Sequence, residues 1–149
     1  MVAYSFKRQF MQPIRERVKP HTLRDFRRGR SRHARPGEQL QLYVGMRTSS
    51  CELIGRAVCD RFQSVSLDFS APNPIVLTDL VEVGFSTFEA AGEPQAVRAV
   101  DSFAVSDGFE DIEAMARFWR DTHDTSIWQG CLIGWDVTTL VLADAAVAA

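Results

Sequence analysis

The sequence predicts an α+β fold with a mostly antiparallel, barrel-like sheet and short helices. Stretches in which apolar and polar residues alternate recur through the first 85 positions, as is typical of half-buried strands. Apolar residues at helical spacing are concentrated after Pro94. Neither a repeat nor a linker interrupts the 149 residues, so we expect a single domain over residues 1–149.

The first half is expected to be rich in strands. Phe10, Ile14 and Val18 recur every four residues and predict one short helix among them. In chain order we expect a strand at 2–6, the helix at 10–18, an extended piece from Leu23, a polar loop at 25–36, a strand at 40–44, a long strand or bent pair at 53–69, a Pro-Asn-Pro turn at 72–74 and one or two strands at 75–85.

The second half is expected to hold helices and one last strand. A short helix at 96–105 should break at Asp107-Gly108, where glycine can supply a positive φ. A better helix is predicted over 111–120, because its acids come early, its arginines come late and Ile112, Met115 and Trp119 share one face. An apolar strand follows at 128–135, and the tail at 140–149 is expected to fray.

Composition indicates an ordinary globular protein, with 46% hydrophobic and 24% charged residues. No apolar run approaches the roughly 20 residues that span a bilayer, and the first residues lack the order of a signal peptide. We therefore expect a cytoplasmic protein that does not bind membranes. Three scattered cysteines and three histidines without ligand spacing predict neither a disulfide framework, nor a metal site, nor a cofactor.

The charge is unevenly placed along the chain. Residues 1–61 hold fourteen of the 17 Lys and Arg and five acids, a net charge of +9, whereas residues 62–149 carry −11. Such asymmetry suggests a cationic surface for a polyanion. The alternative is that the two halves pair with each other inside one fold.

Residues 19–37 concentrate this positive charge, with one Lys and six Arg against a single Asp. Arginine's planar fork suits bidentate phosphate contacts and stacking on bases. We expect a phosphate-gripping loop made by Arg27, Arg28, Arg30, Arg32 and Arg35. The same loop could instead dock an acidic protein partner.

Four blocks of sequence, in order, resemble the ASCH domain family of the PUA-like superfamily of small β-barrels. They are YSFKRQF at 4–10, KPHTLR at 19–24, PGEQLQLYVGMRT at 36–48 and SDGFEDIEAMARFW at 106–119. The second block contains the K-x-x-T-x-R element that is the usual signature of the family. Residues 70–100 are covered least and are expected to hold an insertion.

The resemblance implies a pocket that binds RNA or a modified nucleoside. Some ASCH proteins are amidohydrolases that remove an acetyl group from N4-acetylcytidine with a lysine, a threonine and an acid. These roles carry over to Lys19, Thr22 and Asp107, although that branch has Glu where this chain has Asp. Arg24 then belongs to the pocket, and Lys7 becomes a possible ligand contact because the first strand lies beside the pocket in the family.

The side chains of Lys19, Thr22 and Asp107 are compatible both with ligand binding and with catalysis. A threonine hydroxyl is a poor nucleophile unless a base takes its proton, which Lys19 could do if desolvation or a nearby cation lowered its pKa. A carboxylate such as Asp107 could then pass a proton to the leaving amine. The structural alternative makes Lys19 and Arg24 anion partners, Thr22 a strand residue and Asp107 a turn residue. We therefore expect a binding domain for RNA or a modified nucleoside, with hydrolysis of an acylated cytosine and protein docking as alternatives.

Overall fold

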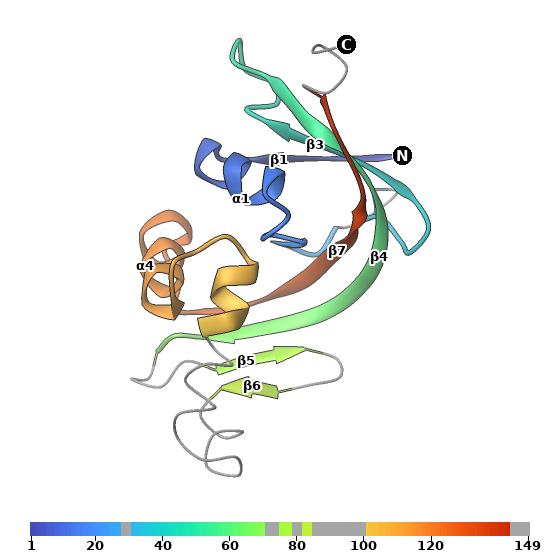
Figure 1. The fold of residues 1–149 in the computed structure, drawn as a ribbon. Helices are drawn as coiled ribbons and strands as arrows, with labels where there is room; N and C mark the ends of the chain where they lie inside the picture. The colour runs from blue at the N-terminus through green and yellow to red at the C-terminus, as the bar shows by residue number, and fades with distance from the viewer. Residues whose placement is uncertain (28–30, 71–74, 79–81, 85–100, 144–149) are drawn as a thin grey trace. The chain divides into compact units, whose positions relative to one another are not determined.

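The computed structural model describes residues 1–27, 31–70, 75–78, 82–84 and 101–143, and Figure 1 shows their fold. The predicted α+β class is confirmed, with a mixed sheet and short helices. The chain contains two compact units. The first comprises Met1–Thr22, Arg27–Phe62 and Ile133–Ala149, and the second comprises Leu23–Phe26 and Gln63–Leu132.

Seven strands make up the described sheet. They are β1 (Val2–Phe6), β2 (His21–Arg24), β3 (Gln39–Val44), β4 (Glu52–Asp68), β5 (Ile75–Thr78), β6 (Glu82–Gly84) and β7 (Ile127–Leu142). Their order is β1-β3-β4-β5-β6, while β7 pairs with both β2 and β4. The β1–β3 pair is parallel, and the β3–β4, β4–β5 and β5–β6 pairs are antiparallel. The sheet is therefore mixed, and closure into a barrel stays a prediction.

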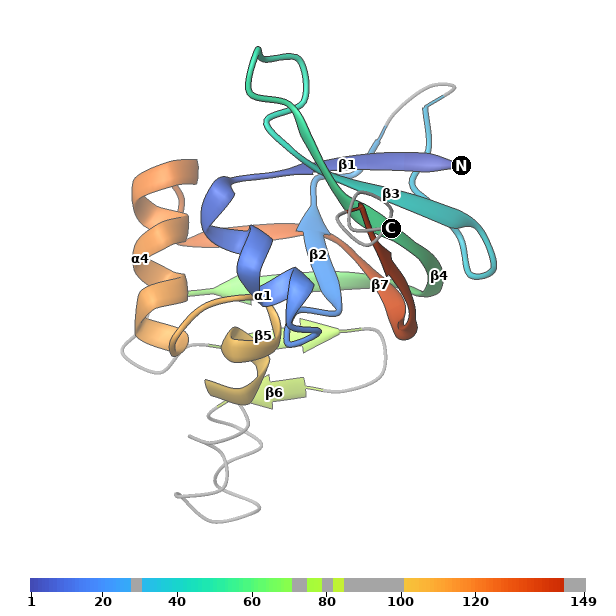
Figure 2. The same ribbon diagram turned by 45° about the horizontal axis from the view of Figure 1, so that its top comes forward.

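The core of the first unit follows from the alternation of β1 and β3, which Figure 2 shows beside each other. Their register sets Tyr4 opposite Leu42 and Phe6 opposite Val44. All four side chains are buried. Because side chains of a strand alternate between the two faces of its sheet, one face of each strand is covered along its length.

The predicted helix at 10–18 is shorter than expected. A 3₁₀ turn, η1 (Arg8–Phe10), leads into α1 (Met11–Arg15). Arg17 then adopts a left-handed backbone with φ of 64°. The amide of Val18 donates back to the Pro13 carbonyl, so the chain leaves the helix and Val18 is exposed rather than part of its apolar face.

Strands β4 and β7 each contribute to both units. The first agrees with the long strand predicted at 53–69. The second continues past the predicted end at 135 as far as Leu142, so residues 140–142 belong to a strand and not to the tail. The stretch DVTTLVL at 136–142 is rich in β-branched residues, which favour strands.

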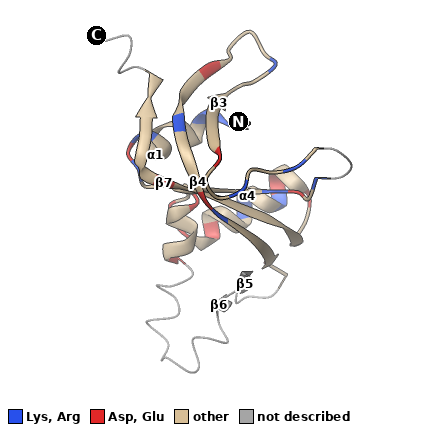
Figure 3. Ribbon diagram, turned by 90° about the vertical axis from the view of Figure 1, so that its right-hand side faces the viewer, with Lys and Arg blue, Asp and Glu red and all other residues tan. Residues whose placement is uncertain are grey.

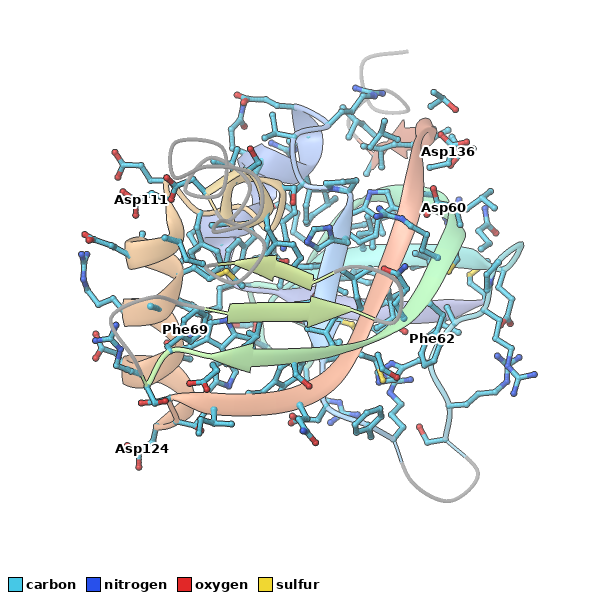
Figure 4. The ribbon with its side chains drawn as sticks, turned by 90° about the horizontal axis from the view of Figure 1, so that it is seen from below. Asp60, Phe62, Phe69, Asp111, Asp124 and Asp136 are labelled. Atoms are coloured by element: carbon cyan, nitrogen blue, oxygen red, sulfur yellow. The ribbon has the colours of Figure 1, made fainter. Side chains whose placement is uncertain are left out.

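The second unit contains α4 (Ile112–His123), which confirms the helix predicted at 111–120. Asp111 caps its first turn by accepting from the Ala114 amide at 2.8 Å. Figure 4 labels Asp111 at the start of the helix and Asp124 at its end. Met115 and Trp119 are buried as predicted, whereas Ile112 is partly exposed.

A second helix ends at the predicted break. Residues 101–106 are helical, and Gly108 has a φ of 97°. The Gly108 amide donates to the Val105 carbonyl at 3.0 Å, and the Phe109 amide donates to the Ala104 carbonyl at 2.9 Å. This pair of bonds is the Schellman arrangement that ends many helices at a glycine.

Several predicted features lie outside the described residues. They are the turn at 72–74, the start of the helix at 96–100, most of the insertion at 70–100 and the end of the tail at 144–149. Within the described part of the chain, no helix is both long enough and apolar enough to cross a membrane.

Candidate functional site

Lys19 is a buried cation in the first unit, with 3% of its surface exposed. Its Nζ lies 4.8 Å from the centre of the Phe10 ring and 5.9 Å from that of Phe6. Both distances are within the range in which an aromatic face attracts an ammonium group. The backbone holds the residue in place, because the Lys19 amide donates to the Pro13 carbonyl.

Two further polar side chains are buried directly after Lys19. His21 and Thr22 are the first residues of β2, and neither exposes more than 4% of its surface. Consecutive strand residues point to opposite faces, so both faces of β2 are covered where it begins. The strand is preceded by Pro20, whose carbonyl accepts from the Trp135 amide of β7 at 2.9 Å.

The burial of Lys19, His21 and Thr22 together is unusual for their residue types. Among the described residues five polar or charged side chains are buried, and these three occur within four positions. Lysine is almost never buried without compensation, because removing its charge from water is unfavourable. Polar residues that are buried against the usual pattern are expected at functional sites.

The loop between β2 and β3 is fastened by an ion pair at its end. The guanidinium of Arg32 makes two hydrogen bonds to the carboxylate of Glu38, one of them 3.0 Å from Nη2 to Oε2. The Arg35 amide donates to Glu38 Oε1 at 2.8 Å. These bonds, that of Arg32 first, lower the pKa of Glu38 to about 2 and raise the pKa of Arg32. Arg32 therefore has a partner within the loop.

The same loop is attached to β1 through Tyr4. Its hydroxyl is hydrogen-bonded to His33 Nδ1 at 3.0 Å and accepts from the Ala34 amide at 3.1 Å. The Arg27 guanidinium lies 5.3 Å from the centre of the Tyr4 ring, and its Nη1 donates to the Arg32 carbonyl at 3.0 Å. The buried Tyr4 therefore contacts residues near both ends of the segment 27–34.

A tight turn joins the loop to the sheet. Residues 35–38 form a type II turn, in which Pro36 occupies the second position and Gly37 has a φ of 93°. The Gly37 amide donates to the Cys59 carbonyl, and the Cys59 amide donates to the Glu38 carbonyl, both at 2.8 Å. The exposed side chain of Arg35 has no hydrogen bond or ion pair to the described residues.

The remaining predicted site residues are distributed over both units. Lys7 is exposed directly after β1, and Arg24 is half-buried at the end of β2 in the second unit. Asp107 is buried and also belongs to the second unit, so the trio of Lys19, Thr22 and Asp107 stays a prediction. Arg28 and Arg30 lie outside the described residues.

Sequence reasoning missed the roles of His21 and His33. The sequence assigned His21 to no strand and no site, but it is buried in β2, which begins two residues before the predicted extended piece. The signal was the pattern HTLR, in which a β-branched residue follows the histidine. His33 is buried through contacts with residues distant in sequence, for which no local signal exists.

The positive charge of the sequence collects in the first unit. That unit holds 13 Lys and Arg against six acids, a net charge of +7, whereas the second unit carries −9. Figure 3 shows blue segments on both sides of the undescribed residues in the loop between β2 and β3. A field of this sign attracts polyanions.

No set of three His, Cys, Asp or Glu among the described residues is placed to hold a metal ion. No protein-family model, no curated protein and no solved structure matches this chain.

Proposed function

We propose that the chain is an ASCH-like domain of PUA-like fold that binds RNA or a modified nucleoside through Lys19 and Thr22. One observation carries this proposal. A lysine is held almost wholly buried against Phe10 and Phe6, three positions before a buried threonine, in the unit of net charge +7.

The chemistry of these residues suits a nucleobase. Base edges present carbonyl and ring-nitrogen acceptors, to which an ammonium group donates. A threonine hydroxyl both donates and accepts, so it can match an edge that carries a carbonyl beside an amino group.

A second candidate function is hydrolysis of an acylated cytosine, and the common burial of Lys19 and Thr22 favours it. A general base and a hydroxyl nucleophile must lie close together, and these two residues are three positions apart, at and just before the start of β2. Lys19 would take the proton of the Thr22 hydroxyl while the hydroxyl oxygen attacks the acyl carbon. Lys19 would then pass that proton to the cytosine amine as the C–N bond breaks, and water would hydrolyse the acyl-threonine ester, releasing the acid and restoring Thr22.

The test is a titration of the purified protein with cytidine and with N4-acetylcytidine, followed by chromatography of the mixtures. We expect saturable binding that Lys19→Met and Thr22→Val each weaken at least tenfold, a loss equivalent to about 1.4 kcal/mol. Thr122→Val is the matched control, because Thr122 is exposed on α4. Appearance of cytidine would establish hydrolysis.

Two results would contradict the proposal. One is the absence of binding to either nucleoside and to single-stranded RNA. The other is binding that Lys19→Met and Thr22→Val both leave unchanged. Nucleoside binding without cytidine release would leave the binding function in place and remove the hydrolase.

A further inference from the structure

An exposed aromatic ring lies beside the arginine-rich loop of the first unit. Phe62 is on β4 and exposes 43% of its surface, and Figure 4 labels it near Asp60 on the same strand. Arg56, Val58, Asp60 and Phe62 are all exposed, at every second position, so they share the outer face of β4.

The neighbour of Phe62 is a fixed side chain. The ring centres of His33 and Phe62 are 6.3 Å apart with an interplanar angle of 37°. His33 is only 7% exposed, and it is hydrogen-bonded to Tyr4, whose ring stacks on it with centres 5.8 Å apart. Phe62 therefore packs on one side against a buried, anchored ring. Little conformational entropy is lost when a ligand covers such a side chain.

Two arginines of the same loop lie near His33 or Tyr4. Arg35 is two residues beyond His33, in the turn that is bonded to β4 at Cys59, and its guanidinium is exposed. Arg27 lies over the Tyr4 ring. Arg32, by contrast, is paired with Glu38 and contributes little net charge. An exposed aromatic ring, together with an exposed arginine that has no ion pair among the described residues, matches the combination that binds single-stranded nucleic acid, in which bases stack and arginines contact phosphates.

We propose that a base of single-stranded RNA stacks on Phe62 while Arg35 contacts a neighbouring phosphate. This contact is additional to Lys19 and Thr22, and it rests on the proposed RNA-binding function. Paired bases in a duplex have both faces covered, so the ring selects unpaired RNA. An acidic peptide would satisfy the arginine but would have no flat ring to place on Phe62.

The experiment measures fluorescence anisotropy of a labelled ten-nucleotide oligouridine with the full chain. We expect Phe62→Leu, which keeps apolar bulk but removes the aromatic face, to weaken binding about tenfold. Phe62→Tyr should bind as the parent does. Val141→Ala, a change at an exposed apolar residue of β7, should have no effect. Because Phe62→Leu removes no cation, the slope of log affinity against log salt should stay unchanged.

The salt dependence separates the ring from the arginine. Arg35→Ser should reduce the magnitude of that slope by about 0.7, the value for one phosphate contact on a single strand. Arg32→Ser is the matched comparison, and we expect its slope to change less, because Glu38 already neutralises this arginine.

Stacking can be measured directly with an oligonucleotide that contains one 2-aminopurine, because the fluorescence of this base is quenched when it stacks. Quenching by the parent and by Phe62→Tyr, but not by Phe62→Leu, supports the proposal. Oligouridine binding by Phe62→Leu at the parental affinity would overturn it while leaving RNA binding in place. The proposal would also be overturned if Phe62→Leu weakened binding to duplex RNA, or to a decamer of glutamate, as much as it weakens binding to oligouridine. A parent that binds neither nucleosides nor RNA would overturn both this proposal and the proposed function.

Discussion

Tyr4 and His33, 29 positions apart, are joined by a hydrogen bond of 3.0 Å between the phenol oxygen and Nδ1. Tyr4 belongs to the first strand, and His33 belongs to the loop that carries most of the arginines. The same oxygen accepts the amide of Ala34, so a single hydroxyl fixes two consecutive residues of the loop. The loop is thereby held against β1 at a defined position.

Removing this hydroxyl should destabilise the protein. Tyr4→Phe leaves the buried Ala34 amide without this acceptor, and we expect a loss of about 1–3 kcal/mol in the free energy of unfolding. Tyr43→Phe is the matched control, because Tyr43 is the other tyrosine and makes no side-chain hydrogen bond among the described residues. Urea denaturation of both variants measures the difference. Equal midpoints would refute the anchoring role of Tyr4.

The ion pair between Arg32 and Glu38 should make the loop insensitive to mild acid. The pKa of Glu38 is lowered from 4.5 to about 2, so its stabilising effect is complete above the unfolded value and is lost as the pH falls toward 2. A carboxyl ¹³C titration should give a midpoint near 2 for Glu38. In Arg32→Ser the midpoint should rise toward the ordinary value. A midpoint near 4.5 in the parent would contradict the pairing.

Gly108 should resist substitution for a conformational reason. Its φ of 97° is unfavourable for a residue with a Cβ atom, so Gly108→Ala should lower stability by about 1–2 kcal/mol. Gly108→Asn should lose less, because asparagine tolerates positive φ better than alanine does. Thermal unfolding of the two variants tests this order. A melting temperature of Gly108→Ala equal to that of the parent would contradict the left-handed assignment.

We expect Lys19 to be required for nucleoside binding rather than for folding. Methionine retains most of the apolar stem of lysine beside Phe10 and Phe6, so Lys19→Met should remain folded and unfold cooperatively. Its nucleoside affinity should fall in the same preparation. A variant with a strongly lowered melting temperature would indicate that Lys19 supports the fold instead.

Local sequence patterns were sufficient to predict most of the strands and α4. Alternation over residues 2–6 and 40–44 predicted β1 and β3, and the acids and arginines of 111–120 predicted a helix whose ends they suit. These features arise within one element, so they are visible in a short window of sequence. The predicted strand ended at 135, whereas β7 continues to Leu142 through a stretch whose β-branched residues favour a strand.

The candidate site was predicted less well, because long-range contacts decide which polar residues are buried. The K-x-x-T-x-R element drew attention to Lys19 and Thr22, but their burial depends on Phe6, Phe10 and the pairing of β2 with β7. Likewise, five arginines were expected to act alike on phosphate. The structure separates Arg32, which is paired with Glu38, from Arg35, which has no ion pair with any residue that the structure describes, and no local pattern contains that difference.

The most direct measurement is a crystal structure of the protein soaked with cytidine at a saturating concentration. The account predicts electron density for the base in the first unit, with a polar atom of the base about 3 Å from Lys19 Nζ or from Thr22 Oγ1. Density for the nucleoside at another place, with Lys19 still packed on Phe10 and Phe6 and no ligand atom near Thr22, would contradict it.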